Sequence, residues 1–196
     1  WAVINNKVKV VEAFSKNSSN FEMKDKNGVN LLMLAAIQNS KDVAGYLINK
    51  GLNIFERDKN TYTALIYAAK NNSLDVAKLL IKKGVDYDEV MPYAVNSDSL
   101  EVMKLLDKEG AKLKYEDKND VNYLMLAASS NSIRVAEYLI KKGINEDSKD
   151  KNGETPLMYA VRNGHIDMAK FLIKKGANKK VENKKDEKLL KVAKTS

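Results

Sequence analysis

Few side chains in this chain have the types and spacing that chemistry requires. The 196 residues include no cysteine, which excludes thiolate nucleophiles, thiolate metal ligands and disulfides, and they include a single histidine, His165. A metal site needs several converging ligands and a catalytic triad needs a nucleophile beside its base, so we interpret His165 as a loop and capping residue. Asp86 and Asp88 are the one carboxylate pair outside a repeating pattern. The sequence therefore predicts a protein that is not an enzyme, with no catalytic residue, metal, cofactor or small-molecule substrate.

The chain carries an excess of positive charge that comes mostly from lysine. The net charge is +8, and of the 34 basic residues only Arg57, Arg134 and Arg162 are arginine. Arginine supplies the planar fork that recognises phosphates and guanine edges, so an excess of lysine, interspersed with 26 acidic residues, argues against specific nucleic-acid recognition. Electrostatic attachment to an anionic surface, either nucleic acid or lipid headgroups, is the alternative function that this excess leaves open. No apolar run approaches the roughly 20 residues of a transmembrane segment.

The elements that must position these side chains recur along the chain. A Lys-Gly or Glu-Gly pair closes an apolar stretch at Gly51, Gly84, Gly110, Gly143 and Gly176, with successive gaps of 33, 26, 33 and 33 residues. Asp-Lys-Asn occurs at Asp25, Asp58, Asp117 and Asp150, and the last three follow the closures at Gly51, Gly110 and Gly143 by seven residues. A fixed period of this length indicates a repeat architecture, with one unit shorter than the others by seven residues.

The clearest unit begins at Asp150 and reads as turn, helix, turn, helix. Thr155 is a plausible N-cap and Pro156 suits the first helical position, so we expect a helix from Pro156 to about Arg162. A second helix follows Asn163-Gly164-His165, and its opening acid, closing lysines and final Gly176 match the helix dipole and a left-handed C-terminal cap.

The motifs of this unit resemble those of ankyrin repeats. Thr155-Pro156-Leu157 followed by Ala160 has the family's T-P-L-H-x-A spacing, and Asn163-Gly164-His165 matches its inter-helix N-G-H. The resemblance implies an all-α ankyrin-repeat solenoid of stacked helix-turn-helix units with short hairpin-like fingers, and a monomeric scaffold that binds another protein. The family's histidine after Leu is replaced by Met33, Ile66, Met125 and Met158, so apolar packing should carry more of the stability. The abundance of Lys, Asn and Ile suits an AT-rich genome, and we expect a bacterial source.

We expect one domain over residues 1–196, with a partial repeat at 1–24 and a capping half-repeat at 183–196. The repeats between them are 25–57, 58–87, 88–116, 117–149 and 150–182. The chain starts at Trp1, inside what reads as a helix, so native residues are expected to precede it. A cytoplasmic location is favoured, and export after removal of an upstream signal stays open.

The resemblance also places the candidate binding residues, because ankyrin repeats usually hold partners on the concave side formed by finger tips and first helices. Tyr62 with Arg57 is the preferred centre, since an aromatic residue near an arginine is typical of interface hot spots. The Lys-Asn pair that follows each aspartate is better explained by turn geometry than by recognition. The full predicted set is Arg57, Lys59, Asn60, Tyr62, Lys70, Asn71, Glu116, Lys118, Lys149, Lys151, Glu154 and Arg162.

The short unit has two interpretations. Glu89, the position equivalent to Thr155, follows Gly84 by five positions, whereas Thr155 follows Gly143 by twelve, so a full finger cannot form there. One hypothesis is that Asp86, Tyr87 and Asp88 make a local acidic notch in a basic surface. The other is a simple deletion, because loops tolerate changes of length at little cost.

Overall fold

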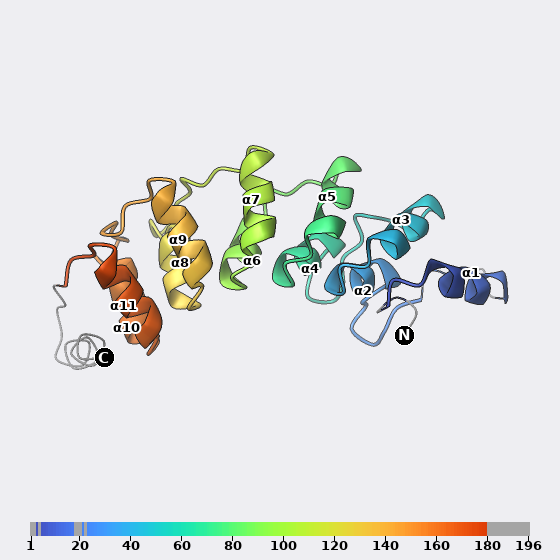
Figure 1. The fold of residues 1–196 in the computed structure, drawn as a ribbon, viewed down its shortest axis with the longest axis horizontal. Helices are drawn as coiled ribbons and strands as arrows, with labels where there is room; N and C mark the ends of the chain where they lie inside the picture. Colours follow the sequence, from blue (N-terminus) through green and yellow to red (C-terminus); the bar gives the residue numbers. More distant parts are fainter. Residues whose placement is uncertain (1–2, 4, 18–20, 22, 180–196) are drawn as a thin grey trace. The chain divides into compact units, whose positions relative to one another are not determined.

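The structure is a computed structural model that describes residues 3, 5–17, 21 and 23–179, and all of its regular elements are α-helices (Figure 1). The all-α repeat fold predicted from the sequence is confirmed. The helices are α1 Val8–Asn17, α2 Leu31–Ile37, α3 Lys41–Asn49, α4 Ala64–Lys70, α5 Leu74–Lys82, α6 Met91–Asn96, α7 Leu100–Lys108, α8 Tyr123–Ser129, α9 Ile133–Lys141, α10 Pro156–Arg162 and α11 Ile166–Lys174. The predicted capping half-repeat at 183–196 lies outside the described residues.

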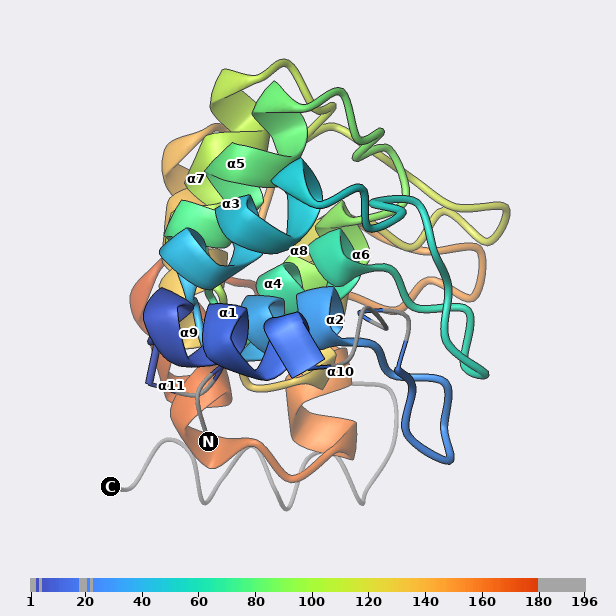
Figure 2. The same cartoon turned by 90° about the vertical axis from the view of Figure 1, so that its right-hand side faces the viewer.

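The chain divides into two compact units. Unit 1 comprises Trp1–Ala94 and Glu101–Ala111, and unit 2 comprises Val95–Leu100 and Lys112–Ser196. Within unit 1, α2 packs on α3 and α4, and α3 packs on α5, so that first helices and second helices form separate layers (Figure 2). Within unit 2, α8 packs on α9 and α10, and α10 packs on α11. The predicted repeat boundaries and the single-domain organisation stay predictions.

Each complete first helix begins at a side-chain cap. Asn30, Thr63, Asn122 and Thr155 have extended backbones, and their side chains accept hydrogen bonds from backbone N–H groups two or three residues later. These bonds satisfy donors that a helix leaves unpaired at its start. The predicted helix from Pro156 to Arg162 and the predicted cap at Thr155 are confirmed. The short unit is the exception, because α6 begins at Met91 rather than directly after Glu89.

Small and branched apolar side chains fill the layers. Ala35, Ala36, Ala68, Ala69, Ala127 and Ala128 are fully buried, which lets neighbouring helices approach closely. Leu47, Leu80, Leu106, Leu139 and Leu172 are fully buried in the second helices. The residues that replace the family's histidine are also apolar and buried at three of the four positions, Met33, Ile66 and Met125.

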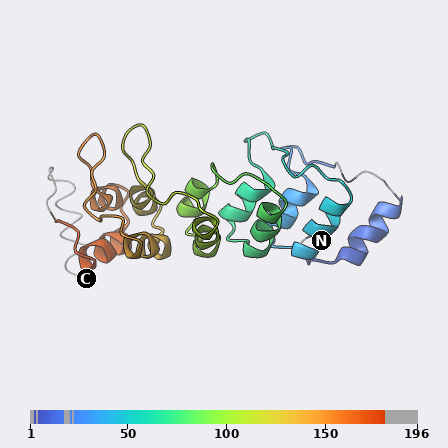
Figure 3. The same ribbon diagram turned by 90° about the horizontal axis from the view of Figure 1, so that it is seen from above.

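The fingers are short hairpins that project beyond the helices of their unit (Figure 3). Isolated antiparallel bridges join Lys24 to Asn30 and Glu116 to Asn122. In each finger one aspartate oxygen accepts the N–H groups of the second and fourth following residues, at 2.8 or 2.9 Å. The aspartates Asp25, Asp58, Asp117 and Asp150 therefore hold the turns of their own fingers, as turn chemistry predicts.

Left-handed asparagines connect successive repeats. Asn6, Asn39 and Asn72 have φ of 51°, 52° and 53°, and each side-chain oxygen accepts two N–H groups from the start of the next repeat's second helix. Asp98 does the same for Val135 in unit 2. The caps of α3, α5, α7 and α9 are thus supplied by the preceding repeat, which couples neighbouring repeats.

Candidate functional site

Tyr62 lies at the centre of an aromatic cluster in unit 1. Its ring makes edge contacts with Tyr67 of α4 and Tyr93 of α6, with ring centres 5.8 and 5.4 Å apart. The ammonium of Lys70, at the end of α4, lies 4.2 Å from the centre of the Tyr62 ring, a cation–π contact. All four side chains are partly exposed, so the cluster is a surface feature. The structure therefore brings two predicted residues, Tyr62 and Lys70, into direct contact.

Arg57 contacts the same finger through a hydrogen bond and also forms an ion pair. Its guanidinium donates to the backbone carbonyl of Thr61 at 2.7 Å and to the carboxylate of Glu89 at 2.5 Å. Arg57 therefore holds the backbone of the finger in place and forms an exposed ion pair with Glu89. Thr61 has φ of 67°, a left-handed conformation that is strained for a β-branched residue.

Next to the aromatic cluster, the buried carboxylate of Asp58 connects the finger to α4. The hydroxyl of Tyr67 donates to Asp58 at 2.7 Å. Burial alone would raise the pKa of Asp58, but the hydrogen bonds from Tyr67 and from the backbone of Tyr62 and Asn60 outweigh it and hold that pKa below its usual value. Burial, and then the bond to the carboxylate, raise the pKa of Tyr67 to about 12.

The other predicted residues of unit 1 have backbone or capping roles. Lys59 donates its backbone N–H to the carbonyl of Asn27 in the preceding finger at 2.9 Å, so the two fingers are paired. Asn60 belongs to the Asp58 turn, and the Asn71 side chain donates to the carbonyl of Tyr67 at the end of α4. The side chains of Lys59 and Asn60 are exposed at the tip.

In unit 2 the predicted residues form two local contacts. Arg162 of α10 makes a bidentate ion pair with Glu154 of the finger, with one bond of 2.6 Å. The ammonium of Lys151 donates to the carbonyl of Lys118 at 2.6 Å, and so ties the tips of neighbouring fingers together. Lys149 is exposed, and the structure gives it no contact with the other predicted residues.

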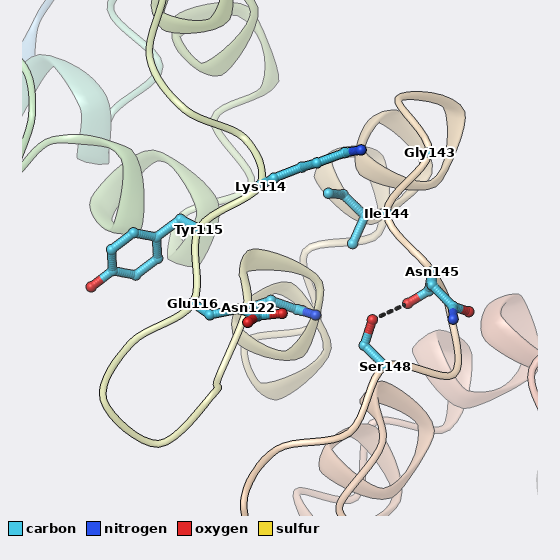
Figure 4. A pocket seen from close by; sticks show the side chains of 8 residues that line it. All are labelled: Lys114, Tyr115, Glu116, Asn122, Gly143, Ile144, Asn145 and Ser148. Carbon is cyan, nitrogen blue, oxygen red and sulfur yellow. Dashed lines mark hydrogen bonds between the residues drawn. The ribbon is translucent and has the colours of Figure 1, made fainter.

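Glu116 lies at a recess of about 290 Å³ in unit 2 (Figure 4). The recess lies between the segment that leads into the finger and the loop that follows α9, and its lining includes Lys114, Asn122, Ile144 and Asn145. Figure 4 shows Lys114 reaching toward the Gly143–Ile144 backbone while Tyr115 points away from the recess. The Tyr115 ring stacks on buried Tyr123, with ring centres 5.1 Å apart, and burial and the neighbouring Tyr115 raise the pKa of Tyr123 to about 12.

A second recess, of about 240 Å³, lies in unit 1. Its lining includes Phe55 and Arg57 from the segment that leads into the finger, and Val85, Asp86 and Asp88 from the loop of the short unit. Of the three residues of the hypothesised acidic notch, Asp86 and Asp88 line this recess and Tyr87 does not, so the notch stays a hypothesis. The hydroxyl of Tyr87 donates instead to the carbonyl of Glu109 at the end of α7, 2.5 Å away.

Other sequence expectations meet specific contacts. His165 occupies the residue before α11, but its side chain makes no capping bond there and instead contacts the carbonyl of Ser129 in the preceding repeat, 2.9 Å from Nε2. The expected loop and N-cap position of His165 is therefore confirmed, but the cap of α11 is not made by its side chain. Over the described residues, no three His, Asp or Glu side chains group closely enough to hold a metal ion. None of the described helices has the length and apolar character that a bilayer crossing needs.

The comparisons with known proteins agree with this architecture. The sequence model of ankyrin repeats, in three copies, matches residues 1–90 and again residues 91–183. The chain belongs to the ankyrin repeat family. Its fold matches the human ASB11 ankyrin repeat domain with a TM-score of 0.76 and 18% identity, over 98% of this chain and 95% of that one. A chain in the structure of the Bd0816 predatory endopeptidase from Bdellovibrio bacteriovorus in complex with immunity protein Bd3460 matches with a TM-score of 0.67 and 26% identity, over 89% and 95%. No curated protein is similar enough in sequence to count as a match.

Sequence reasoning missed several residues of this ankyrin repeat site. Tyr67 and Tyr93 were not among the predicted site residues, yet both contact Tyr62, and all three side chains are partly exposed. Glu89 was named only as the equivalent of Thr155. Phe55 was not predicted as a site residue, although 59% of its surface is exposed. The one signal in the sequence that could have drawn attention to this recess was a large aromatic residue, Phe55, in the segment that leads into a finger.

Proposed function

We propose that this ankyrin repeat protein is a non-enzymatic scaffold that binds a protein partner through its fingers and first helices, with the Tyr62 cluster as the main contact. Ankyrin repeats are generally protein–protein interaction modules, which sets the class of function. The face and the residues are our inference from the contacts around Tyr62.

The observation that carries the proposal is the set of contacts around Tyr62. Interface hot spots are enriched in tyrosine, tryptophan and arginine because such side chains offer a large contact area while losing little conformational freedom. Tyr62, Tyr67 and Tyr93 present three partly exposed rings from three different elements. The ring contacts and the Lys70 ammonium restrict Tyr62 before any partner arrives, which lowers the entropy that binding would otherwise cost.

Backbone strain beside the cluster supports the same location. Thr61 is exposed and adopts a left-handed conformation that costs on the order of 1–2 kcal/mol in a residue with a side chain. The same position has positive φ in the other fingers, at Gly28, Asp120 and Gly153, so the turn requires this conformation, and Thr61 carries the strain in the finger that bears Tyr62. The Arg57 bond to the Thr61 carbonyl helps to enforce it here, directly next to Tyr62.

The experiment is capture of partners from a lysate of the source organism on the immobilised full chain, with washes at about 0.1 M and about 1 M salt. The test variant carries Arg57→Ala and Tyr62→Ala. The control carries Glu101→Ala and Lys104→Ala, which removes an exposed ion pair on α7 of the same unit and leaves the fingers intact. Circular dichroism and urea unfolding establish that all three chains are folded.

The proposal expects a protein that the parent and the control retain at high salt and that the test variant loses. Recovery of only nucleic acid or lipid, released equally from all versions at high salt, would replace the proposal with the electrostatic alternative. Equal retention of a protein by the parent and the test variant would overturn the Tyr62 site while leaving a scaffold function that uses another face.

A further inference from the structure

The two recesses occupy equivalent places in the repeat but differ in chemistry. Asp58 and Asp117 begin equivalent fingers and are 59 residues apart, and the same shift places Phe55 on Lys114, Arg57 on Glu116 and Asp86 on Asn145. Each recess therefore lies between a finger-leading segment and the loop after the next second helix. The fold makes the hollow in both units, and the side chains decide what each hollow can accept.

The recess of unit 1 combines an apolar wall with excess negative charge. Phe55 is 59% exposed and Val85 is 6% exposed, and they supply the apolar surface. Three carboxylates also line it, from Asp86, Asp88 and Glu89. Arg57 is paired with Glu89, so the charge of the two aspartates is not neutralised within the lining. This local excess of two negative charges stands in a chain whose net charge is +8.

A metal ion does not explain these carboxylates. In the part of the chain that the structure describes, Asp86, Asp88 and Glu89 do not converge into a group that could hold one. Asp86 uses one oxygen to accept the backbone N–H of Asp88 at 3.0 Å, which shapes the loop and leaves its second oxygen available. Carboxylates that line a recess together with apolar side chains suit an organic cation with a hydrocarbon stem better than a compact ion.

We propose that this recess receives a lysine or arginine side chain of the protein partner, with its methylene stem against Phe55 and Val85 and its charged end beside Asp86 and Asp88. Basic side chains have this division, an apolar stem with a cationic head. The inference rests on the proposed scaffold function and adds the chemistry of one partner residue. Arg57 both lines the recess and braces the finger of Tyr62, so an extended partner segment could engage both places.

The recess of unit 2 is the internal comparison. Its lining carries one lysine and one glutamate, Lys114 and Glu116, so their charges cancel. Amide and hydroxyl groups of Asn122, Asn145 and Ser148 supply the remaining polar surface. A cationic side chain should therefore prefer the recess of unit 1, although the two hollows are similar in size and position.

The first test uses the ¹⁵N-labelled full chain and N-acetyl-arginine methylamide as the probe, added up to about 10 mM because a single side chain binds weakly. Saturable shifts of the backbone amides at 55–57 and 85–89 are expected, with none at 114–116 and 143–148. N-acetyl-citrulline methylamide, which has the same shape without the charge, should bind at least about tenfold more weakly. Equal shifts with both probes, or no local shift at 85–89, would overturn the proposal.

The variant Asp86→Asn/Asp88→Asn should abolish these shifts. Asparagine at 86 keeps the side-chain oxygen that accepts the Asp88 N–H, so the loop shape is preserved while the charge is removed. The matched control, Glu101→Gln/Glu109→Gln, removes the same charge from exposed positions of unit 1 outside the recess. If the probe binds the double asparagine variant as well as it binds the parent, the carboxylates do not recognise it and the proposal is wrong.

The lysate capture separates this proposal from the function on which it rests. A partner lost with Tyr62→Ala but retained in full by Asp86→Asn/Asp88→Asn would leave the scaffold standing and refute the recess. A partner whose affinity falls about tenfold or more with the asparagine pair, and is unchanged by the glutamine control, would support both. If no protein is captured, the probe titration still decides whether the recess accepts a basic side chain.

Discussion

Replacing Asn39 by glycine should weaken the coupling between two repeats. Asn39 lies between α2 and α3, and its side-chain oxygen accepts the N–H groups of Asp75 and Val76 at 3.0 and 3.2 Å, at the start of α5 in the next repeat. Its amide nitrogen also donates to the Asp75 carboxylate at 3.2 Å. Ser73 precedes α5 but makes no side-chain capping bond of its own. Asn39 is therefore the side chain that caps this helix.

The expected loss follows from the cap. Removing an N-cap side chain costs about 0.5–2 kcal/mol, and glycine keeps the left-handed conformation without strain. Asn39→Gly should thus destabilise by about 1–2 kcal/mol, and Asn39→Ala by about 2–3 kcal/mol, because alanine adds the cost of a φ near 52°. The difference between the two variants isolates the backbone term from the cap.

Asn131 provides a matched control. It has φ of 59° at the same repeat position, between α8 and α9, but its side chain makes no hydrogen bond to any residue that the structure describes. Asn131→Gly should therefore stay within about 0.5 kcal/mol of the parent. Urea unfolding measures the free energies, and amide hydrogen exchange at Asp75 and Val76 locates the effect. Equal destabilisation by Asn39→Gly and Asn131→Gly would refute the cap supplied across repeats.

Four further substitutions test individual contacts. Ser99 has the one buried side-chain oxygen without a partner among the described residues, so Ser99→Ala should be neutral or stabilising by up to about 1 kcal/mol. Ser40→Ala should instead destabilise by about 1 kcal/mol, because the Ser40 hydroxyl donates to the backbone carbonyl of Val3 at 2.5 Å. Urea unfolding measures both free energies. Thr61→Gly should stabilise by about 1 kcal/mol in the same assay, because glycine removes the left-handed strain. Tyr67→Phe should raise the pKa of Asp58 and cost about 1–2 kcal/mol near neutral pH. Because folding lowers the pKa of Asp58, the stability that its carboxylate contributes is present above the unfolded-state pKa and is lost as pH falls through the folded-state pKa. Thermal unfolding should therefore show that the parent loses stability below about pH 4 and that the Tyr67→Phe variant loses less over the same range.

The local signals of the sequence were sufficient for the helices and the turns. Thr155 and Pro156 predicted where α10 begins, and the structure has the helix at Pro156–Arg162. The repeated Asp-Lys-Asn was interpreted as turn chemistry, and the aspartates do bond to their own backbone. These features depend on residues within about four positions of one another, so one sequence contains the necessary information.

Contacts between repeats were not predictable in the same way. The partners of Asn39 lie 36 and 37 residues along the chain, and nothing in its neighbours distinguishes it from Asn131, which has no such bond. The orientation of Tyr87 depended on where α7 ends, because its hydroxyl reaches Glu109, 22 residues later. His165 resembled a local cap in sequence, but a carbonyl 36 residues earlier is its partner. Such choices are made by packing of one repeat on the next.

One position in the first helix decides how firmly each finger is held. Tyr67 and Tyr159 lie nine residues after Asp58 and Asp150 and use the second oxygen of the carboxylate, whereas leucine follows Asp25 and Asp117 at the same distance.

In each unit the unanchored finger is bonded to the anchored one, through the N–H groups of Lys59 and Lys151. Arg57 and Tyr62 flank one anchored finger, and Glu154 with Arg162 braces the other. The candidate contact residues thus occur where the finger is tied both to its helix and to its neighbour. A partner would meet side chains that are already fixed, so a larger share of the contact energy would appear as affinity.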